Sequence, residues 1–582
     1  MKIRIFAFTI FILSIISCES KKTHTTAGFP TPFEQSDSTE TTTYLQAIDF
    51  YIKLAKEFSA INIQTIGETD SGYPLHMVTY NPDGNFNFQK LKKNKTIVFI
   101  NNGIHPGESD GIDATMLLYR DFALGKLNPP KNTTIVTIPI YNVGGALNRN
   151  STSRVNQNGP KSYGFRGNAT NYDLNRDFIK NDTKNSRTFT EIFHMVDPDV
   201  FIDNHVSNGA DYQYTLTHLF TQHNKLGGEL GAYIHKEMMP ALENTLQKDG
   251  WPITPYVNVF NKVPEGGFSQ FIDHPRYSTG YAALWNTFGM MVETHMLKPY
   301  NKRVRGTYAL LNKIIDIAEK DGTRIKALRT KAKTRHKNWT YYPTKWGIDS
   351  SKTTILNFKG FEADTIISKV TGLNRLKYNR KRPFTKPVPY QNYFKPLDSV
   401  KIPKAYIIKK GWEQVISRLQ LNHIKYSVIK QDTSLMVESY KILDYKTSQH
   451  PYEGHYLHDN TKVVGSLKKI TFSKGAIVVP TDQSGIRYLL ETMEPATKDS
   501  FFNWNFFDAI LQQKEGFSPY VFEDLAAEIL ENNSFLKDSF EEKKALEPAF
   551  NNDWFAQLNW IYLHSKYYEP AHLQYPVYRI LK

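Results

Sequence analysis

The feature that most constrains the fold is a pair of apolar, β-branched runs with an amphipathic segment between them. The runs are KTIVFI (95–100) and TTIVTIPIY (133–141), and the segment DATMLLYRDFAL (113–124) has a helical period. Strands that are apolar at every position are buried on both faces of a sheet. Alternation of such strands with helices predicts an α/β fold with helices on both faces of the sheet.

The same alternation continues on both sides of these runs. Further helices are expected at 44–58, 186–196, 228–246 and 306–333, and further strands at 62–66, 75–80, 199–203 and 289–293. These elements belong to one domain, which we place at residues 43–335.

At 582 residues the chain is too long for a single core. Residues 336–399 include the Pro- and Lys-rich KYNRKRPFTKPVPYQNYFKPL and are interpreted as a linker or an extended segment. After it, strand and helix patterns in AYIIKKGWEQVISRLQLNHIKYSVI and GAIVVPTDQSGIRYLLETMEP predict a smaller C-terminal α/β accessory domain at 400–582.

The N-terminus has the pattern of an export signal. Lys2 and Arg4 precede a short apolar run, Ile5–Ile16, which is typical of a signal peptide over residues 1–18. The residues up to Cys18 resemble a bacterial lipobox, in which the cysteine is lipidated; the alternative is a plain signal peptide. Residues 19–42 are polar and predict a flexible tether. We therefore expect a protein of the bacterial cell envelope, held to the membrane by a lipid anchor.

Two composition facts narrow the chemistry. Cys18 is the single cysteine, so neither an intrachain disulfide nor a thiolate metal site is possible. The net charge is +15, but the basic residues are spread along the chain without a basic helix, so no nucleic-acid partner is expected.

A histidine and a carboxylate follow the first buried strand. In IVFINNGIHPGESDGIDA (97–114), His105 and Glu108 lie on a turn that Pro106 and Gly107 keep from being a regular helix. Open α/β sheets bind ligands beyond the carboxyl ends of their strands. Imidazole and carboxylate suit Zn²⁺, so the pair predicts part of a zinc site.

A third ligand is available in DVFIDNHVSNG (199–209), where His205 follows another strand. A catalytic zinc ion usually has three protein ligands and leaves one position for water. Asp203, two residues earlier, could orient the imidazole.

Arginines and a late glutamate complete the set of candidates. RGNATNYDLNRDF (166–178) gathers Arg166, Asn175 and Arg176, and a guanidinium binds a carboxylate through two parallel hydrogen bonds. FGMMVETHM (288–296) places Glu293 at the end of an apolar strand. A carboxylate there is costly unless it is paired or serves as a general base.

These motifs, in this order, resemble the zinc metallocarboxypeptidases of the carboxypeptidase A type. HPGE, DLNRDF, DNH and VETH follow one another as in that family, over roughly residues 43–330. The resemblance implies a mixed sheet and a single zinc ion.

The resemblance also implies a role for each matching residue. His105, Glu108 and His205 would bind zinc, Glu293 would activate the water, and Arg166 would stabilise the oxyanion. Asn175 and Arg176 would hold the terminal carboxylate of a peptide. Arg154 competes with Arg166, and Tyr277, in HPRYSTGY, is the candidate for a tyrosine over the substrate.

The function expected from these motifs is hydrolysis of a peptide bond next to a free C-terminus. Two alternatives share the metal plan: an N-acyl amino acid deacylase and a hydrolase of peptidoglycan stem peptides. A third alternative is a lipid-anchored binding protein with an inactive peptidase fold. The sequence specifies neither the oligomeric state nor the preferred terminal residue.

Overall fold

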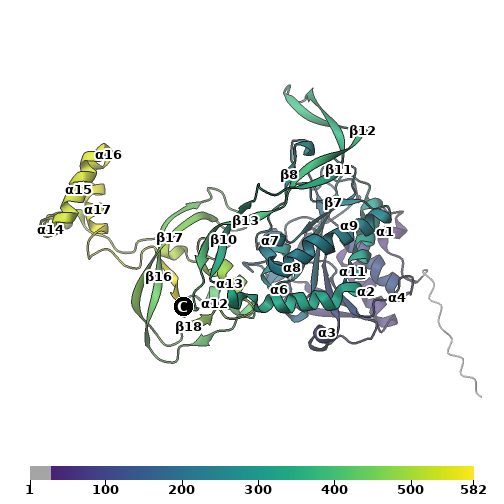
Figure 1. Cartoon of the computed structure of the whole chain (residues 1–582), viewed down its shortest axis with the longest axis horizontal. Coiled ribbons are helices and arrows are strands. Elements are labelled where there is room, and N and C mark those ends of the chain that lie inside the picture. Colours follow the sequence, from purple (N-terminus) through teal and green to yellow (C-terminus); the bar gives the residue numbers. More distant parts are fainter. Residues whose placement is uncertain (1–27, 582) are drawn as a thin grey trace, which may run out of the picture.

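The computed structural model describes residues 28–581 (Figure 1). The predicted signal peptide, its lipidation site Cys18 and the first part of the predicted tether, residues 19–27, lie outside the described residues. Within the described range, no helix combines the length and the apolar character that crossing a bilayer requires.

The first domain is built on an eight-stranded sheet with the strand order β1-β2-β4-β3-β5-β9-β6-β7. The strands are β1 (Ile61–Glu68), β2 (Pro74–Tyr80), β3 (Thr96–Asn101), β4 (Thr133–Ile138), β5 (Val200–Ser207), β6 (Leu216–Phe220), β7 (Ile253–Pro255) and β9 (Phe288–His295). The four central strands β4, β3, β5 and β9 are parallel. The pairs β1–β2, β2–β4 and β6–β9 are antiparallel, so the sheet is mixed.

Strand β3 shows why the run at residues 97–100 is apolar at every position. All six of its residues are buried, and its two faces meet different helices. On one face the Phe99 ring stacks on Phe189 of helix α6 (Lys184–Val196), with ring centroids 5.8 Å apart. On the other, Thr96 lies so close to Gly322 of helix α11 (Tyr300–Thr334) that a Cβ at Gly322 would be 2.0 Å from Thr96 Oγ1.

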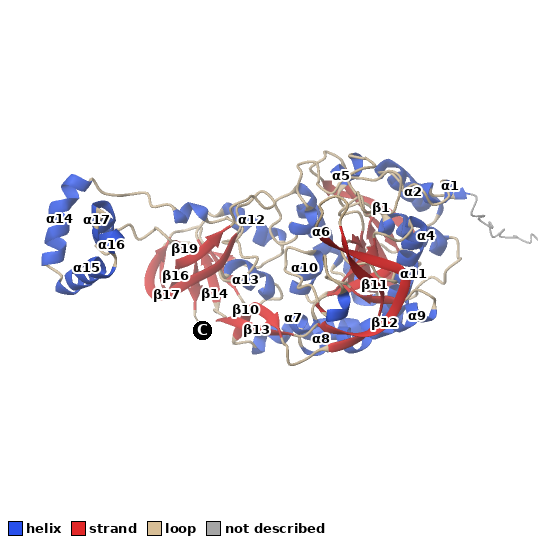
Figure 2. Cartoon of the chain, turned by 90° about the horizontal axis from the view of Figure 1, so that it is seen from above, coloured by secondary structure: helices blue, strands red, loops and turns tan. Residues whose placement is uncertain are grey.

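Helices cover both faces of the sheet (Figure 2). The helices are α2 (Tyr44–Glu57), α3 (Phe88–Asn94), α4 (Asp110–Ala123), α5 (Val143–Leu147), α6 (Lys184–Val196), α7 (His223–Leu226), α8 (Gly228–Tyr233), α9 (Met239–Lys248), α10 (Ser278–Leu284) and α11 (Tyr300–Thr334). Helices α6 and α10 meet through Phe193 and Tyr281, whose ring centroids are 5.3 Å apart. The predicted α/β class, with a mixed sheet and helices on both faces, is confirmed.

Helix α11 begins earlier than the hydrophobic pattern predicts, at Tyr300 rather than near residue 306. Its first turn contains Arg303, which reads as a surface residue but is fully buried. The Arg303 Nε lies 3.1 Å from Asp110 Oδ2 at the start of α4. A buried ion pair, which sequence periodicity does not report, thus joins the first turns of α11 and α4.

The second part of the chain contains the expected C-terminal sheet domain. Its six strands, in the order β15-β18-β14-β19-β16-β17, pair only in the antiparallel sense. They are β14 (Ala405–Ile408), β15 (Ser427–Val428), β16 (Thr433–Thr447), β17 (His458–Phe472), β18 (Ile477–Pro480) and β19 (Gln574–Ile580), and helices α12 (Glu413–Leu421) and α13 (Ile486–Met493) pack with them.

Among the described residues, three further units lie outside these two sheets. Between the domains the chain forms the antiparallel pairs β10 (Tyr341–Ile348) with β13 (Phe394–Lys401) and β11 (Thr354–Ile367) with β12 (Asn374–Gln391). A group of helices stands apart at the far end (Figure 1). It consists of α14 (Pro519–Glu531), α15 (Ser534–Leu546), α16 (Pro548–Asn551) and α17 (Trp554–Leu563).

Close packing of α4 on β5 gives a test of this arrangement. A Cβ at Gly111 in the first turn of α4 would lie 2.4 Å from Asn204 Cβ. Replacing Gly111 by Ala should therefore lower the stability by about 1–3 kcal/mol, as overpacking does. The matched control is Gly411→Ala, because Gly411 has open space around it and should change stability by less than about 0.5 kcal/mol. Thermal unfolding followed by circular dichroism measures both, and equal midpoints for the two variants would contradict the packing.

Candidate metal centre and substrate pocket

The three predicted metal ligands come from two neighbouring parallel strands. His105 and Glu108 lie in the loop between β3 and α4, and His205 lies within β5. Gly103, with φ of +64°, turns the chain away from the strand, a conformation that glycine adopts without strain. All three side chains are buried, with 3–4% of their surface exposed.

The ligand atoms of these residues face one another. One atom from each of His105, Glu108 and His205 lies within 4.8 Å of the other two. The Nδ1 of His105 is 3.2 Å from Glu108 Oε1, and the Nδ1 of His205 is 3.2 Å from Glu108 Oε2. Such a cluster of two imidazoles and one carboxylate is a donor set that zinc accepts.

The buried Nδ1 of His105 shows that this cluster fits a metal ion. Among residues 28–581 no group forms a hydrogen bond with this buried nitrogen, and its neighbour Glu108 Oε1 faces it at 3.2 Å without hydrogen-bond geometry. A buried nitrogen that makes no hydrogen bond is costly, and coordination of a cation would remove that cost. Burial alone would raise the pKa of Glu108, but His105 and Arg154 outweigh it and hold this pKa well below its ordinary value. The carboxylate is therefore in the ionised form that a cation requires.

Two further carboxylates fix the imidazole rings from behind. The Nε2 of His205 is 2.9 Å from Asp203 Oδ2, and the Nε2 of His105 is 2.9 Å from Asp173 Oδ1. Metal-bound histidines almost always donate their second nitrogen in this way. The sequence suggested Asp203 for this task but not Asp173, although Asp173 is the first residue of the DLNRDF motif.

Glu293 lines the same pocket from β9. It is the register partner of His205 across the β5–β9 pair, so the two side chains leave the sheet on the same face. Burial raises the pKa of Glu293 to about 7, with His205 opposing the rise and Glu108 adding to it. A carboxylate that changes protonation near neutral pH can both accept and donate a proton.

The predicted arginines surround the carboxylate ligand. Arg154 Nη1 is 2.8 Å from Glu108 Oε1, and Arg166 Nη1 is 3.6 Å from the same oxygen. Arg166 also contacts Asp173 Oδ2 through Nε, at 3.0 Å, and through Nη2, at 2.9 Å. Both guanidinium groups are therefore held beside the cluster, and both line the pocket.

Asn175 and Arg176 form another part of the pocket wall. They lie in a single 3-10 turn, Leu174–Arg176, whose first residue follows Asp173. The guanidinium carbon of Arg176 lies 4.7 Å from the centroid of the Tyr277 ring. Within the described part of the chain, nothing hydrogen-bonds to the buried Asn175 Oδ1. The Asn175 Oδ1 is thus available to accept a hydrogen bond from a ligand.

All nine predicted metal, catalytic and substrate-binding residues line one cavity of about 290 Å³. Tyr281, the neighbour of Tyr277 in the sequence motif, is instead buried in α10 and donates to Asn422 at 2.7 Å. The sequence reasoning missed other lining residues, which come from separate loops and strands without a shared motif: Val206, Ser207, Asn208, Leu219, Tyr256, Asn258, Phe260, Phe271 and Met291.

Comparison with known proteins agrees with the motifs. Residues 48–204 match the family model of zinc carboxypeptidases. The match spans β1 to β5 and contains His105 and Glu108; it ends one residue before His205. The search of curated protein sequences finds no match.

Solved structures that resemble the chain include three carboxypeptidases. A metallo-carboxypeptidase from Burkholderia cenocepacia is 14% identical, with 47% of this chain and 68% of that chain covered and a TM-score of 0.34. Carboxypeptidase A from Helicoverpa armigera is 14% identical, with 50% and 74% covered and a TM-score of 0.37. A metallo-carboxypeptidase from Pseudomonas aeruginosa, in complex with (2-guanidinoethylmercapto)succinic acid, is 11% identical, with 49% and 70% covered and a TM-score of 0.36.

Metal binding should be visible as thermal stabilisation. Adding Zn²⁺ to chelator-treated protein should raise its unfolding temperature, because a ligand at about 1,000 times its Kd stabilises the native state by about 4 kcal/mol. The His205→Ala variant should lose this response. The matched control is His218→Ala, since His218 hydrogen-bonds to Glu243 outside the cluster and should leave the response intact. Differential scanning calorimetry measures the shift; an equal zinc response in wild type and His205→Ala would rule out this centre.

Proposed function

We propose that the protein is a zinc-dependent carboxypeptidase that removes residues from the C-terminus of peptides. The observation that carries the proposal is the buried His105–Glu108–His205 cluster, in which the His105 Nδ1 makes no hydrogen bond. Glu293 lines the same cavity as these ligands. The family match of residues 48–204 supports the same activity.

The three ligands would hold one zinc ion. When bound, this ion would lower the pKa of a water molecule on it and would polarise the substrate carbonyl. Glu293 takes a proton from the attacking water as the water oxygen bonds to the carbonyl carbon. The same carboxyl group then gives this proton to the amide nitrogen as the carbon–nitrogen bond breaks. The products are a shortened peptide with a new carboxylate and a free amino acid.

Three further residues of the pocket are proposed to stabilise the transition state and to bind the substrate. Arg166 is proposed to stabilise the negative charge that develops on the carbonyl oxygen, because its Nη1 lies beside Glu108 on the edge of the cluster. Asn175 and Arg176 are proposed to bind the terminal carboxylate of the substrate. An arginine binds a carboxylate through two parallel hydrogen bonds, which a lysine cannot reproduce.

Four classes of substrate distinguish the candidate functions: free peptides, their C-terminal amides, N-acyl amino acids and peptidoglycan stem peptides. Mass spectrometry of digests with and without a chelator should show chelator-sensitive loss of C-terminal residues from free peptides and not from their amides. Cleavage confined to N-acyl amino acids or to stem peptides would replace the peptidase by the corresponding alternative. Zinc binding without any cleavage would favour the binding protein.

Replacing Glu293 by Gln should lower kcat by about 10²–10⁴-fold, the contribution of a general acid–base group. The substituted amide cannot accept the proton, whereas the three zinc ligands are unchanged, so zinc content should stay at the wild-type level. Glu229→Gln, at an exposed glutamate of the same domain, is the control and should keep full activity. Wild-type kcat in Glu293→Gln would remove Glu293 from the mechanism.

A further inference from the structure

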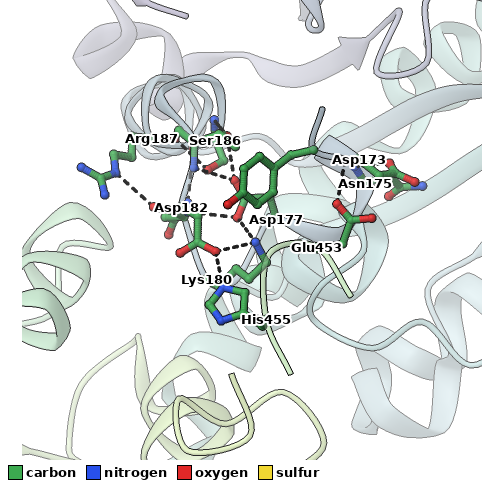
Figure 3. A network of polar contacts seen from close by, with 12 residues as sticks. Asp173, Asn175, Asp177, Lys180, Asp182, Ser186, Arg187, Glu453 and His455 are labelled. Atoms are coloured by element: carbon green, nitrogen blue, oxygen red, sulfur yellow. Dashed lines mark hydrogen bonds and ion pairs between the residues drawn. The ribbon is translucent and has the colours of Figure 1, made fainter. Parts of the chain in front are cut away.

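One loop of the C-terminal domain contacts the segment that forms a wall of the substrate pocket. This loop, residues 448–457, connects β16 to β17 and is called the β16–β17 loop below. Its tip is a tight turn in which Tyr452 and His455 pair through backbone hydrogen bonds of 2.7 and 3.1 Å. Between them Glu453 and Gly454 have φ values of +51° and +77°. The Glu453 and His455 side chains point from this turn toward Asp173 and Asp182 of the first domain (Figure 3).

Glu453 binds the backbone of the residue that orients His105. The amide of Asp173 donates a hydrogen bond to Glu453 Oε2 at 2.7 Å. The carboxylate of the same Asp173 contacts His105 and Arg166. Asp173 is also the N-terminal cap of the turn that carries Asn175 and Arg176. Glu453 of the second domain therefore holds the backbone of Asp173, the residue that connects the metal ligand His105 with the Asn175–Arg176 turn.

Tyr452 is one of the groups that act on Arg176: burial alone would lower the pKa of this guanidinium, but Asp173, Tyr277 and Tyr452 outweigh it. The Tyr452 ring is held in turn by its own domain, where it stacks on Trp504 with centroids 6.1 Å apart. The Arg276 guanidinium lies 5.6 Å from the Tyr452 centroid and is anchored on Asp499 at 2.6–2.8 Å. Arg176 thus interacts with Tyr277 of the first domain and with Tyr452 of the second.

The segment that follows Arg176 is clamped by buried charges. Lys180 lies 2.9 Å from Asp177 and 2.6 Å from Asp182. From the second domain, His455 Nε2 lies 2.7 Å and Arg418 Nη2 lies 2.9 Å from the two oxygens of Asp182. Buried ions keep their positions when each charge is paired, since an unpaired one is costly. The loop cannot move away from this segment without separating His455 from Asp182.

We infer that the β16–β17 loop completes the carboxylate-binding side of the pocket, with Glu453 and Tyr452 as positioning residues for the Asn175–Arg176 turn. This inference rests on the proposed function for its substrate, a peptide with a free C-terminal carboxylate. The C-terminal domain thereby has a role in substrate binding. Tyr452 and Glu453 do not line the cavity themselves, but they hold the Asn175–Arg176 turn, which does.

Tyr452→Phe and Glu453→Ala in the full-length protein test the inference. Each should raise KM for free peptides by about tenfold, the effect of weakening one hydrogen bond to a charged or oriented group, with kcat nearly unchanged. Glu453→Gln should restore KM, because its amide oxygen can still accept the Asp173 hydrogen bond. Tyr456→Phe, at an exposed tyrosine of the same loop, is the matched control and should keep the wild-type KM.

Amide hydrogen exchange provides a readout that does not depend on activity. The Asp173 amide should exchange faster in Glu453→Ala than in wild type, and Glu453→Gln should slow it again. Wild-type KM in Tyr452→Phe and Glu453→Ala, or a fall in kcat with KM unchanged, would overturn the inference. If the wild-type protein cleaves no peptide, the proposed function fails, and unchanged Asp173 exchange in Glu453→Ala would then overturn the positioning role separately.

Discussion

The parallel alignment of β3, β5 and β9 is the constraint on which the site depends. Parallel neighbours end at the same edge of a sheet, so side chains at or just after their carboxyl ends are brought together. His105 follows β3, His205 lies in β5, and Glu293 lies opposite His205 in β9. Helices on both faces bury these strands, which keeps the cluster out of bulk water. The chemistry thus follows from strand order and direction.

Asp173 links the parts of this pocket that the sheet does not align. Its carboxylate contacts His105 and Arg166, and its amide donates to Glu453. Burial alone would raise the pKa of Asp173, but His105 and Arg166 outweigh it and hold this pKa well below its ordinary value. An ionised carboxylate at this point orients the imidazole and neutralises the guanidinium. The predicted metal ligand His105 and the pocket residue Arg166 are therefore both held by the Asp173 carboxylate.

The sequence predicted the residues whose position follows from the strands. A histidine shortly after an apolar run, like His105, or near the end of one, like His205, lies at the carboxyl end of its strand, which is why both could be named. The position of Arg303 could not, because a buried arginine looks like a surface one until its partner Asp110 is known. The interactions of Glu453 were equally hidden: it lies 280 residues from Asp173, and no local pattern records such a contact.

The central claim is that His105, Glu108 and His205 bind one zinc ion between them. Anomalous diffraction at the zinc absorption edge, from crystals of the full-length protein grown with Zn²⁺, tests it most directly. The account predicts a single strong peak about 2.0–2.1 Å from one nitrogen of each imidazole and about 2.0–2.2 Å from a Glu108 oxygen. A zinc peak elsewhere, with no peak among His105, Glu108 and His205, would contradict it.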